Sequence, residues 1–294
     1  MPQADIQHNG VTYGNLRLYK ALIRLLGHVN IKIVYAVMRI FIIPVTMVIS
    51  PGARLTYDYF HRIRGYGRWK SICYTYRNHC VFGETVIDKF AMYAGHHFKF
   101  AYYGQDVYDK YASKPGPLIQ LNAHIGCCEI LGYSYHTEKR CNILVFGGEN
   151  VALMDYRKAS FEEMNMRMIP VGIGTNHSEE MIDALDRGEI LSVFADRYMN
   201  INKVIVSTLF GHEVNLARGP FSLATTRGID VIMVSAMKEK DGSYSVYYTP
   251  LPYDKTLPLK QQRQQLADAY AAEIERLISK YPYQWFNYFS PWRQ

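Results

Sequence analysis

From residue 117 onward, short apolar runs rich in β-branched and aromatic residues alternate with segments of helical periodicity. Short apolar runs bounded by polar or turn residues are typical of buried strands. Regular alternation of the two patterns predicts an α/β sheet covered by helices. The expected strands cover 117–122, 142–147, 167–173, 190–195, 204–211, 231–237 and 244–250, and the expected helices cover 126–136, 151–165, 178–188, 219–228 and 259–281.

The N-terminal region has a different pattern. Segment 55–93 has aromatic and aliphatic residues at helical spacing, which predicts helices broken near 65–67, where two glycines occur. Segment 31–50 is mostly apolar but contains Arg39 and Pro44. A spanning helix needs about 20 apolar residues, and an arginine at mid-bilayer costs roughly 2.5–3.5 kcal/mol. Anchoring within one leaflet therefore fits better than a span, and an amphipathic helix packed on a soluble core is the alternative.

No repeat or linker divides the chain after Leu55, so we expect two parts. Residues 1–54 form an N-terminal helical membrane-associating segment, and residues 55–294 form the catalytic domain. Basic side chains on both sides of 31–50 suit an anionic membrane surface. They are Arg17, Lys20, Arg24, Arg54, Arg62, Arg64, Arg68 and Lys70.

Composition narrows the class of protein. The 294 residues are 49% hydrophobic, which supports a large core and argues against disorder. A net charge of +7 favours anionic partners: phospholipid, nucleic acid, a phosphorylated substrate or an acidic carrier protein. Five irregularly spaced cysteines without a CxxC pair indicate a reduced, cytosol-facing chain.

The stretch PLIQLNAHIGCCEI, residues 117–130, carries the candidate chemistry. If 117–121 is a strand, His124 lies at its carboxyl end, where active sites of open α/β sheets gather. His124 and Glu129 can meet only if the histidine lies at or before the start of the next helix, because five residues along a helix point about 140° apart. His124 could then act as a base oriented by Glu129, and free N–H groups near Gly126 could bind an oxyanion.

Two other chemistries use the same stretch. Cys127 or Cys128 could act as a thiol nucleophile, but cysteines on a helix face are usually packing residues, and no second histidine stands nearby. His124, Cys127 and Glu129 could bind a metal, but no other ligand cluster accompanies them.

Other residues are weaker candidates for substrate or oxyanion binding. Asp196 and Arg197 end an apolar strand, and Arg218 with Gly219 opens an expected helix. All four could therefore face the crevice at the carboxyl ends of the strands. A surface ion pair and a helix-start turn explain them equally well. Arg157 or Arg167 could bind a lipid phosphate or be solvated helix charges. The aromatic C-terminus could close the core, line an acyl-chain tunnel or meet an interface.

Several motifs, in order, resemble those of the lipid A biosynthesis acyltransferases, the lauroyl and myristoyl transferases within the lysophospholipid acyltransferase superfamily. AHIGCCE matches the family's His-x4-Asp/Glu signature, ILSVFADR its strand ending in an acidic residue, and YPYQWFNYF its closing Pro-x-Gln-Trp. STLFGHEVNLARGPFSLATTRGIDVIMV also resembles its Gly-x-x-x-Leu-Ala region. The chain departs from the pattern at Cys127 and Cys128, where the family commonly has Asn and Trp, and at Arg197, where Gln is frequent.

The resemblance implies a mixed, largely parallel sheet flanked by helices, as in glycerol-3-phosphate acyltransferases. It also implies transfer of a fatty acyl chain from an acyl carrier protein or coenzyme A thioester to a hydroxyl or amine of a membrane lipid. His124 would deprotonate the acceptor and Glu129 would orient His124, with no bound cofactor or metal and no covalent acyl-enzyme. The expected location is the cytoplasmic face of the bacterial inner membrane, with acyl carrier protein as a partner and no nucleic acid.

Two alternatives remain open at this point. The same His/Glu site could hydrolyse a lipid or an acyl thioester with water as acceptor. The chain could also be a non-catalytic membrane-binding relative that keeps the fold.

Overall fold

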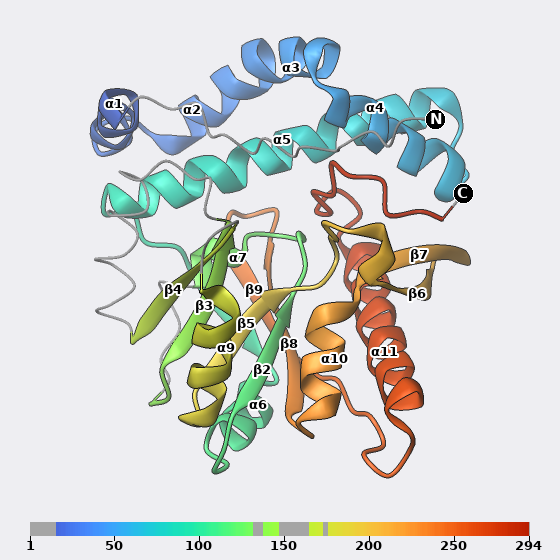
Figure 1. The fold of residues 1–294 in the computed structure, drawn as a ribbon. Helices are drawn as coiled ribbons and strands as arrows, with labels where there is room; N and C mark the ends of the chain where they lie inside the picture. The colour runs from blue at the N-terminus through green and yellow to red at the C-terminus, as the bar shows by residue number, and fades with distance from the viewer. Residues whose placement is uncertain (1–15, 132–137, 147–164, 173–175, 294) are drawn as a thin grey trace.

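The computed structural model describes residues 16–131, 138–146, 165–172 and 176–293. A seven-stranded sheet forms its centre, in the order β1-β9-β8-β2-β5-β3-β4 (Figure 1). The strands are β1 (Phe100–Tyr103), β2 (Leu118–Asn122), β3 (Cys141–Phe146), β4 (Met166–Val171), β5 (Ile190–Phe194), β8 (Asp230–Lys238) and β9 (Tyr244–Pro250).

The sheet is mixed and largely parallel, as expected. Strands β8, β2, β5, β3 and β4 run parallel to one another. Strand β9 pairs antiparallel with β8 and parallel with β1. The central strand β2 is buried along its whole length, and its two polar side chains, Gln120 and Asn122, both donate hydrogen bonds to Ser192 of β5. The predicted fold class is confirmed, and the carboxyl ends of the parallel strands lie at one edge of the sheet.

Helices cover both faces of the sheet. On one face, Leu185, Phe221 and Tyr270 from three different helices join a single core with β2, β5 and β8. On the other face, Tyr108 and Ile130 pack in a second core. The helices are α9 (His177–Asp186), α10 (Arg218–Thr226) and α11 (Leu259–Lys280) on the first face, and α6 (Gln105–Ala112) and α7 (Cys128–Leu131) on the second. The helix expected over 151–165 lies almost entirely outside the described residues.

A short hairpin corrects the prediction for 204–211. This segment forms β6 (Val204–Leu209), which pairs antiparallel with β7 (His212–Ala217) in a separate two-stranded sheet rather than joining the main one. Phe210 and Gly211 have φ values of 52° and 77°, as a tight hairpin turn requires. The N–H of Phe210 donates to Glu275 of α11 at 2.6 Å, which holds this uncommon backbone conformation.

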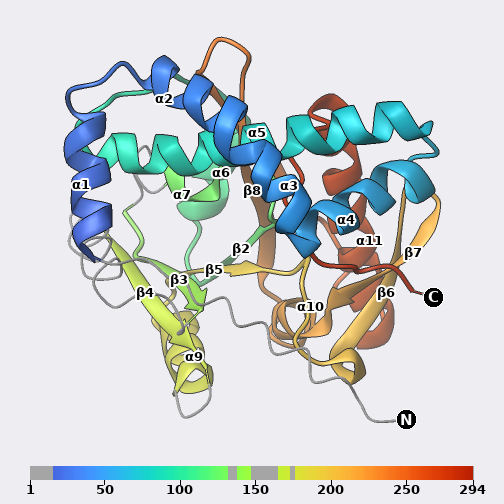
Figure 2. The ribbon, with the colours of Figure 1, turned by 90° about the horizontal axis from the view of Figure 1, so that it is seen from above.

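The N-terminal helices form a layer above the carboxyl edge of the sheet. Helix α5 (Arg68–Tyr93) crosses this edge, and the preceding helices lie over α5 (Figures 1 and 2). The predicted break at 65–67 is confirmed, since η2 ends at Ile63 and α5 begins at Arg68. The remaining elements are α1 (Leu16–Leu26), α2 (Ile31–Val37), η1 (Met38–Ile42), α3 (Ile43–Ile49), α4 (Pro51–Asp58), η2 (Tyr59–Ile63) and the short η3 (Ile201–Lys203).

The apolar segment Ile31–Ile49 is a helix interrupted by a π-helical turn. Pro44 cannot donate a backbone hydrogen bond, and its ring crowds the carbonyl of the preceding turn, so a π-helical stretch directly before it accommodates the strain. One face of the segment docks closely on α5: a Cβ atom on Gly83 would lie 2.6 Å from Met38 Sδ.

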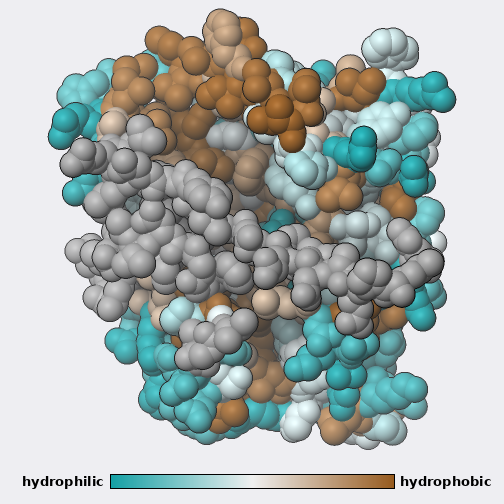
Figure 3. All heavy atoms as spheres, turned by 45° about the horizontal axis from the view of Figure 1, so that its top comes forward, coloured by the Kyte–Doolittle hydropathy of each residue, from teal (hydrophilic) through white to brown (hydrophobic). Residues whose placement is uncertain are grey.

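The opposite face of this segment is apolar and exposed. By length and composition Ile31–Ile49 could cross a membrane, with a mean hydropathy of 2.0. Figure 3 shows hydrophobic residues gathered at the top of the molecule, where this segment lies. We call its exposed large side chains the apolar face: Ile33, Val37, Ile40, Phe41, Ile42, Val45, Val48 and Ile49.

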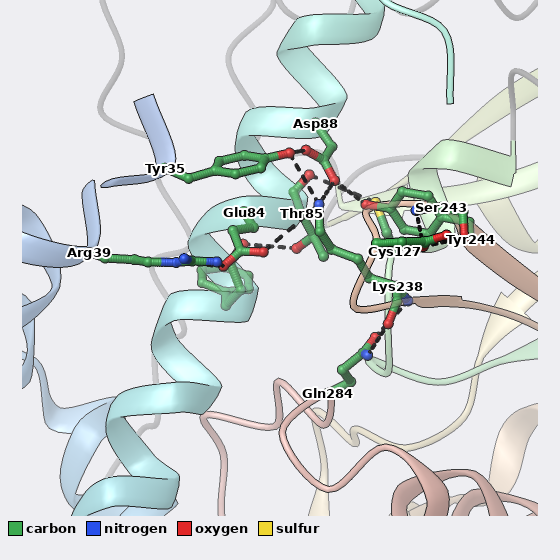
Figure 4. Close-up of polar contacts among 12 residues, drawn as sticks. Tyr35, Arg39, Glu84, Thr85, Asp88, Cys127, Lys238, Ser243, Tyr244 and Gln284 are labelled. Atoms are coloured by element: carbon green, nitrogen blue, oxygen red, sulfur yellow. Dashed lines mark hydrogen bonds and ion pairs between the residues drawn. The ribbon is translucent and has the colours of Figure 1, made fainter. Parts of the chain in front are cut away.

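A buried polar cluster joins the N-terminal layer to the sheet (Figure 4). Asp88 of α5 is completely buried and accepts hydrogen bonds from Lys238 Nζ at the end of β8, from the Tyr35 hydroxyl of α2 and from the Tyr244 hydroxyl of β9. One turn away on α5, Glu84 accepts two hydrogen bonds from Arg39, at 2.6 and 3.0 Å. Arg39, the charged residue near the middle of the apolar segment, is therefore paired within the protein.

Loss of the Asp88 carboxylate should destabilise the protein strongly. In Asp88→Ala, Lys238 loses its closest partner and keeps a buried charge whose remaining carboxylate, Glu84, lies 3.9 Å away and is shared with Arg39. The free energy of unfolding should therefore fall by about 3 kcal/mol in urea titrations. Adding Lys238→Met removes that charge and should restore part of the loss. The control Asp58→Ala breaks a surface pair with Arg62 and should change stability by less than about 1 kcal/mol. A double variant no more stable than Asp88→Ala would contradict this account.

Candidate active site

His124 lies in a loop directly after β2. The loop, residues 123–127, follows the last strand residue Asn122 and precedes α7, which begins at Cys128. We call this segment the His124 loop. The histidine thus precedes the helix that carries Glu129, which satisfies the geometric condition set by their spacing, and it lies at the carboxyl edge of the sheet.

The side chain of His124 is held by Asp196. Its Nδ1 lies 2.8 Å from Asp196 Oδ1, and its backbone N–H donates to Oδ2 at 2.8 Å. Strand register explains the pairing, because Asn122 of β2 is the partner of Phe194 in β5 and each functional residue follows two positions later. The His124 side chain is 31% exposed while Asp196 is 2% exposed, so Nε2 is the ring atom left for a substrate.

The environment keeps Asp196 ionised. Burial alone would raise the pKa of its carboxyl, but the His124 ring, its hydrogen bonds and Arg197 outweigh burial and lower the pKa below the usual 3.8. At neutral pH the carboxylate accepts the hydrogen bond that Nδ1–H donates, and it stabilises positive charge on the imidazole. The pair therefore has the arrangement of a general base and its orienting carboxylate.

Glu129 occupies a different place from the one predicted. Its carboxylate forms an ion pair with Lys89 of α5 at 2.7 Å, while Nδ1 of His124 faces Asp196. The prediction that Glu129 orients His124 is therefore corrected. Sequence spacing favoured the nearer carboxylate, whereas the parallel pairing of β2 and β5 brings in one that is 72 residues away.

Gly126 is required at its position for a different reason from the one predicted. Its φ is +59°, and a Cβ atom would lie 2.0 Å from the carbonyl oxygen of Ala236, so only glycine fits. Its N–H donates to the carbonyl of Gln284 at 2.8 Å, and the next N–H, of Cys127, donates to Ala236 at 2.8 Å. The N–H groups of Gly126 and Cys127 are therefore occupied and are not free to bind an oxyanion. Oxyanion binding by the next N–H groups, at the start of α7, stays a prediction.

The weaker candidates separate into two groups. Arg197 follows Asp196, is mostly buried, and donates from Nη2 to the Phe286 carbonyl at 2.8 Å; burial lowers the pKa of its guanidinium. Arg218 and Gly219 begin α10, and the preceding residue Ala217 donates to the carbonyl of Ala195 at 3.0 Å. The start of α10 therefore lies beside Asp196.

Arg167 does not join this group, and Arg157 lies outside the described residues. Arg167 pairs with Glu180 of α9 at 2.5 Å. Arg167 of β4 is the register partner of Asn142 of β3, and Asn142 is the register partner of Leu191 of β5. Leu191 lies five residues before Asp196 in the chain. Five strand residues span roughly 16 Å, so Arg167 lies toward the opposite end of the sheet. The prediction that it binds a phosphate or oxyanion at this site is corrected.

Cys127 at the end of the His124 loop and Cys128 at the start of α7 have the properties of packing residues. Burial raises the pKa of the Cys127 thiol to about 12 and also raises the pKa of Cys128. A thiolate nucleophile is disfavoured in such surroundings. In the part of the chain that the structure describes, no group of three or more His, Cys, Asp or Glu side chains could hold a metal ion.

The fold and the His124–Asp196 pair fit an enzyme of acyl transfer, and comparison with known proteins identifies the family. Residues 100–294 match the family model of bacterial lipid A biosynthesis acyltransferases. The match covers well over half of the chain, so the chain belongs to this family and is an acyltransferase of the lipid A and lysophospholipid type.

The chain is also similar to a solved structure, the 1-acyl-sn-glycerophosphate (LPA) acyltransferase PlsC from Thermotoga maritima. The two are 14% identical, the alignment covers 90% of this chain and 97% of that one, and the TM-score is 0.38. A search of curated proteins found no match.

Replacing the two carboxylates should separate their roles. Asp196→Asn keeps the shape but removes the acceptor for Nδ1–H, and we expect kcat for acyl transfer to fall roughly 10²- to 10⁴-fold. Glu129→Gln should lower kcat by less than about tenfold, because its carboxylate is paired with Lys89 rather than with the ring. Steady-state assays of both variants give the comparison. A larger loss in Glu129→Gln than in Asp196→Asn would return the orienting role to Glu129.

Proposed function

We propose that the protein transfers a fatty acyl chain from a thioester of acyl carrier protein or coenzyme A to a hydroxyl or amine of a membrane lipid, a lipid A precursor or a related lipid. The single observation that carries this proposal is the hydrogen-bonded pair of His124 and Asp196 at the carboxyl edge of the sheet. Membership of the lipid A acyltransferase family supplies the reaction class.

The pair supports direct transfer. His124 Nε2 takes the proton of the acceptor hydroxyl or amine as its oxygen or nitrogen attacks the thioester carbonyl. Asp196 stabilises the imidazolium that forms. The tetrahedral intermediate then collapses, the C–S bond breaks, and the departing thiolate takes the proton from the imidazolium. The products are an ester or amide and a free thiol, and no acyl-enzyme forms.

Neighbouring residues have supporting roles in this proposal. Glu129, through its ion pair with Lys89, fastens α7 to α5 and so helps to fix the His124 loop. Arg218 and Gly219, at the helix start beside Asp196, are our candidates for contact with a lipid phosphate or with the oxyanion. Arg197 acts by holding the C-terminal segment at Phe286.

The N-terminal segment, residues 1–54 in our division, provides membrane attachment in this proposal. The exposed apolar face would insert into the lipid while Arg39 remains paired with Glu84, which favours a helix lying within one leaflet over a span. Helix α5 separates this face from the His124 loop, so the active site lies about one helix diameter, roughly 10 Å, from the inserted segment. We place the protein at the cytoplasmic face of the bacterial inner membrane, where the basic surface attracts anionic lipid and an acidic carrier protein.

Acyl transfer should depend on His124. In His124→Ala, product formation from labelled acyl thioester and lipid extract should fall at least roughly 10²-fold, because the proton acceptor is lost. Binding to anionic vesicles should stay unchanged, which serves as the control for folding. Undiminished transfer by His124→Ala would remove the base from the mechanism. Release of free acid at the same rate with and without lipid would identify a hydrolase instead.

Membrane binding should depend on the apolar face. Val48 and Ile49 are 85% and 73% exposed. Val48→Glu with Ile49→Glu should weaken vesicle binding by at least roughly 10²-fold, since burying each side chain contributes about 1.5–3 kcal/mol and each 1.4 kcal/mol is about tenfold. Ile182→Glu changes an exposed apolar residue of α9 and is the matched control. Co-sedimentation with anionic phospholipid vesicles measures both. Equal binding by the double variant and Ile182→Glu would rule out insertion through this face.

A further inference from the structure

The segment that follows α11 lies along the His124 loop. We call residues 283–288 the C-terminal brace. Trp285 forms an antiparallel bridge with Ile125, the Gly126 N–H donates to the Gln284 carbonyl at 2.8 Å, and the Phe286 N–H donates to the His124 carbonyl at 2.8 Å. The backbone of His124 therefore depends directly on the position of the brace.

The side chain of Gln284 fixes the brace to the central sheet. Its Oε1 accepts from the backbone N–H of Lys238 at 2.8 Å, and its Nε2 donates to the Lys238 carbonyl at 2.6 Å. The amide thus pairs with the last residue of β8 as a peptide group of a neighbouring strand would. Gln284 is 6% exposed, so solvent does not compete strongly for these two bonds (Figure 4).

Lys238, whose backbone binds the Gln284 side chain, is itself held in place by its own side chain. The side chain of Lys238 is 5% exposed, and its ammonium group donates to Asp88 of α5. The same stretch of β8 also holds the other side of the His124 loop, because Cys127 N–H donates to Ala236. The loop is therefore fastened to β8 twice, once directly and once through Gln284.

Other contacts hold the two ends of the brace. Asn78 of α5 donates from Nδ2 to the carbonyls of Tyr283 and Trp285, at 3.0 and 2.8 Å. Arg197 donates to the carbonyl of Phe286. These bonds keep the brace in the molecule when the Gln284 amide is removed, so the expected effect is a shift of the brace rather than its release.

We propose that Gln284 is a positioning residue for the acyl transfer reaction, which sets the place of His124 through the brace. The inference rests on the proposed role of His124 as base. Gly126 packs closely against the Ala236 carbonyl, so the loop cannot absorb a shift of the brace locally, and the shift is transmitted to the loop backbone. Misplacement of a catalytic group by about 1 Å can cost roughly 10²-fold in rate.

The test compares two buried glutamines. Gln284→Met keeps the side-chain length and loses both bonds to Lys238. Gln262→Met is the matched control: Gln262 is also 6% exposed, and it donates to the carbonyls of Leu257 and Lys255 at 2.6 and 3.2 Å, at the start of α11. We expect Gln284→Met to lower kcat roughly 10- to 100-fold with KM changed less than about twofold, and Gln262→Met to keep kcat within about twofold at a similar loss of melting temperature.

A second substitution keeps the proposal testable if Gln284→Met folds poorly. Gln284→Glu retains the acceptor for the Lys238 N–H but sets a carboxylate oxygen against the Lys238 carbonyl in place of the donor, so it should lower kcat at least as much as Gln284→Met, again with little change in KM. Wild-type kcat in Gln284→Glu and in folded Gln284→Met, or equal kcat losses in Gln284→Met and Gln262→Met, would overturn the positioning role. Full activity of His124→Ala would instead overturn the proposed function, whatever the glutamine variants show.

Discussion

The buried ion pair between Lys238 and Asp88 ties the layers of the molecule together. Lys238 ends β8 and Asp88 lies on α5, and the Tyr35 hydroxyl extends the cluster to α2. A buried charge without a partner is strongly unfavourable, so the sheet, α5 and the N-terminal segment must assemble in one relative placement. Because the Lys238 backbone also binds the Gln284 side chain, the same residue fixes the segment that supports the active-site loop.

The main architecture could be predicted from the sequence, because buried strands and helices show characteristic spacings of apolar residues. The apolar run ending at Asn122 is a buried central strand, and His124 follows it at the carboxyl edge as expected. Segment 204–211 was assigned correctly as a strand but to the wrong sheet. Apolar periodicity shows that a strand is buried and says nothing about which strand it pairs with.

The same limit explains the error at Glu129. Asp196 was a candidate from its place at a strand end, yet its contact with His124 depends on β2 and β5 being parallel neighbours. The sequence carries no direct record of strand order, and the nearer carboxylate was therefore favoured. Gln284 belongs to the closing Pro-x-Gln-Trp motif, but the motif does not show which groups the glutamine side chain contacts. Its role becomes visible only from the two hydrogen bonds to Lys238.

Helix α5 contacts both the N-terminal segment that carries the apolar face and the region of the His124 loop. Glu84 and Asp88, one turn apart, contact Arg39 and Tyr35 of the N-terminal segment. The next residue in each case, Thr85 and Lys89, contacts the catalytic side, through Cys127 and Glu129 respectively. Adjacent residues on a helix point about 100° apart, so the same stretch of α5 contacts the N-terminal segment on one side and the region of the His124 loop and α7 on the other. In the proposed membrane-bound state, α5 would set the depth of His124 relative to the apolar face, and so the height at which an acceptor headgroup reaches the proposed base.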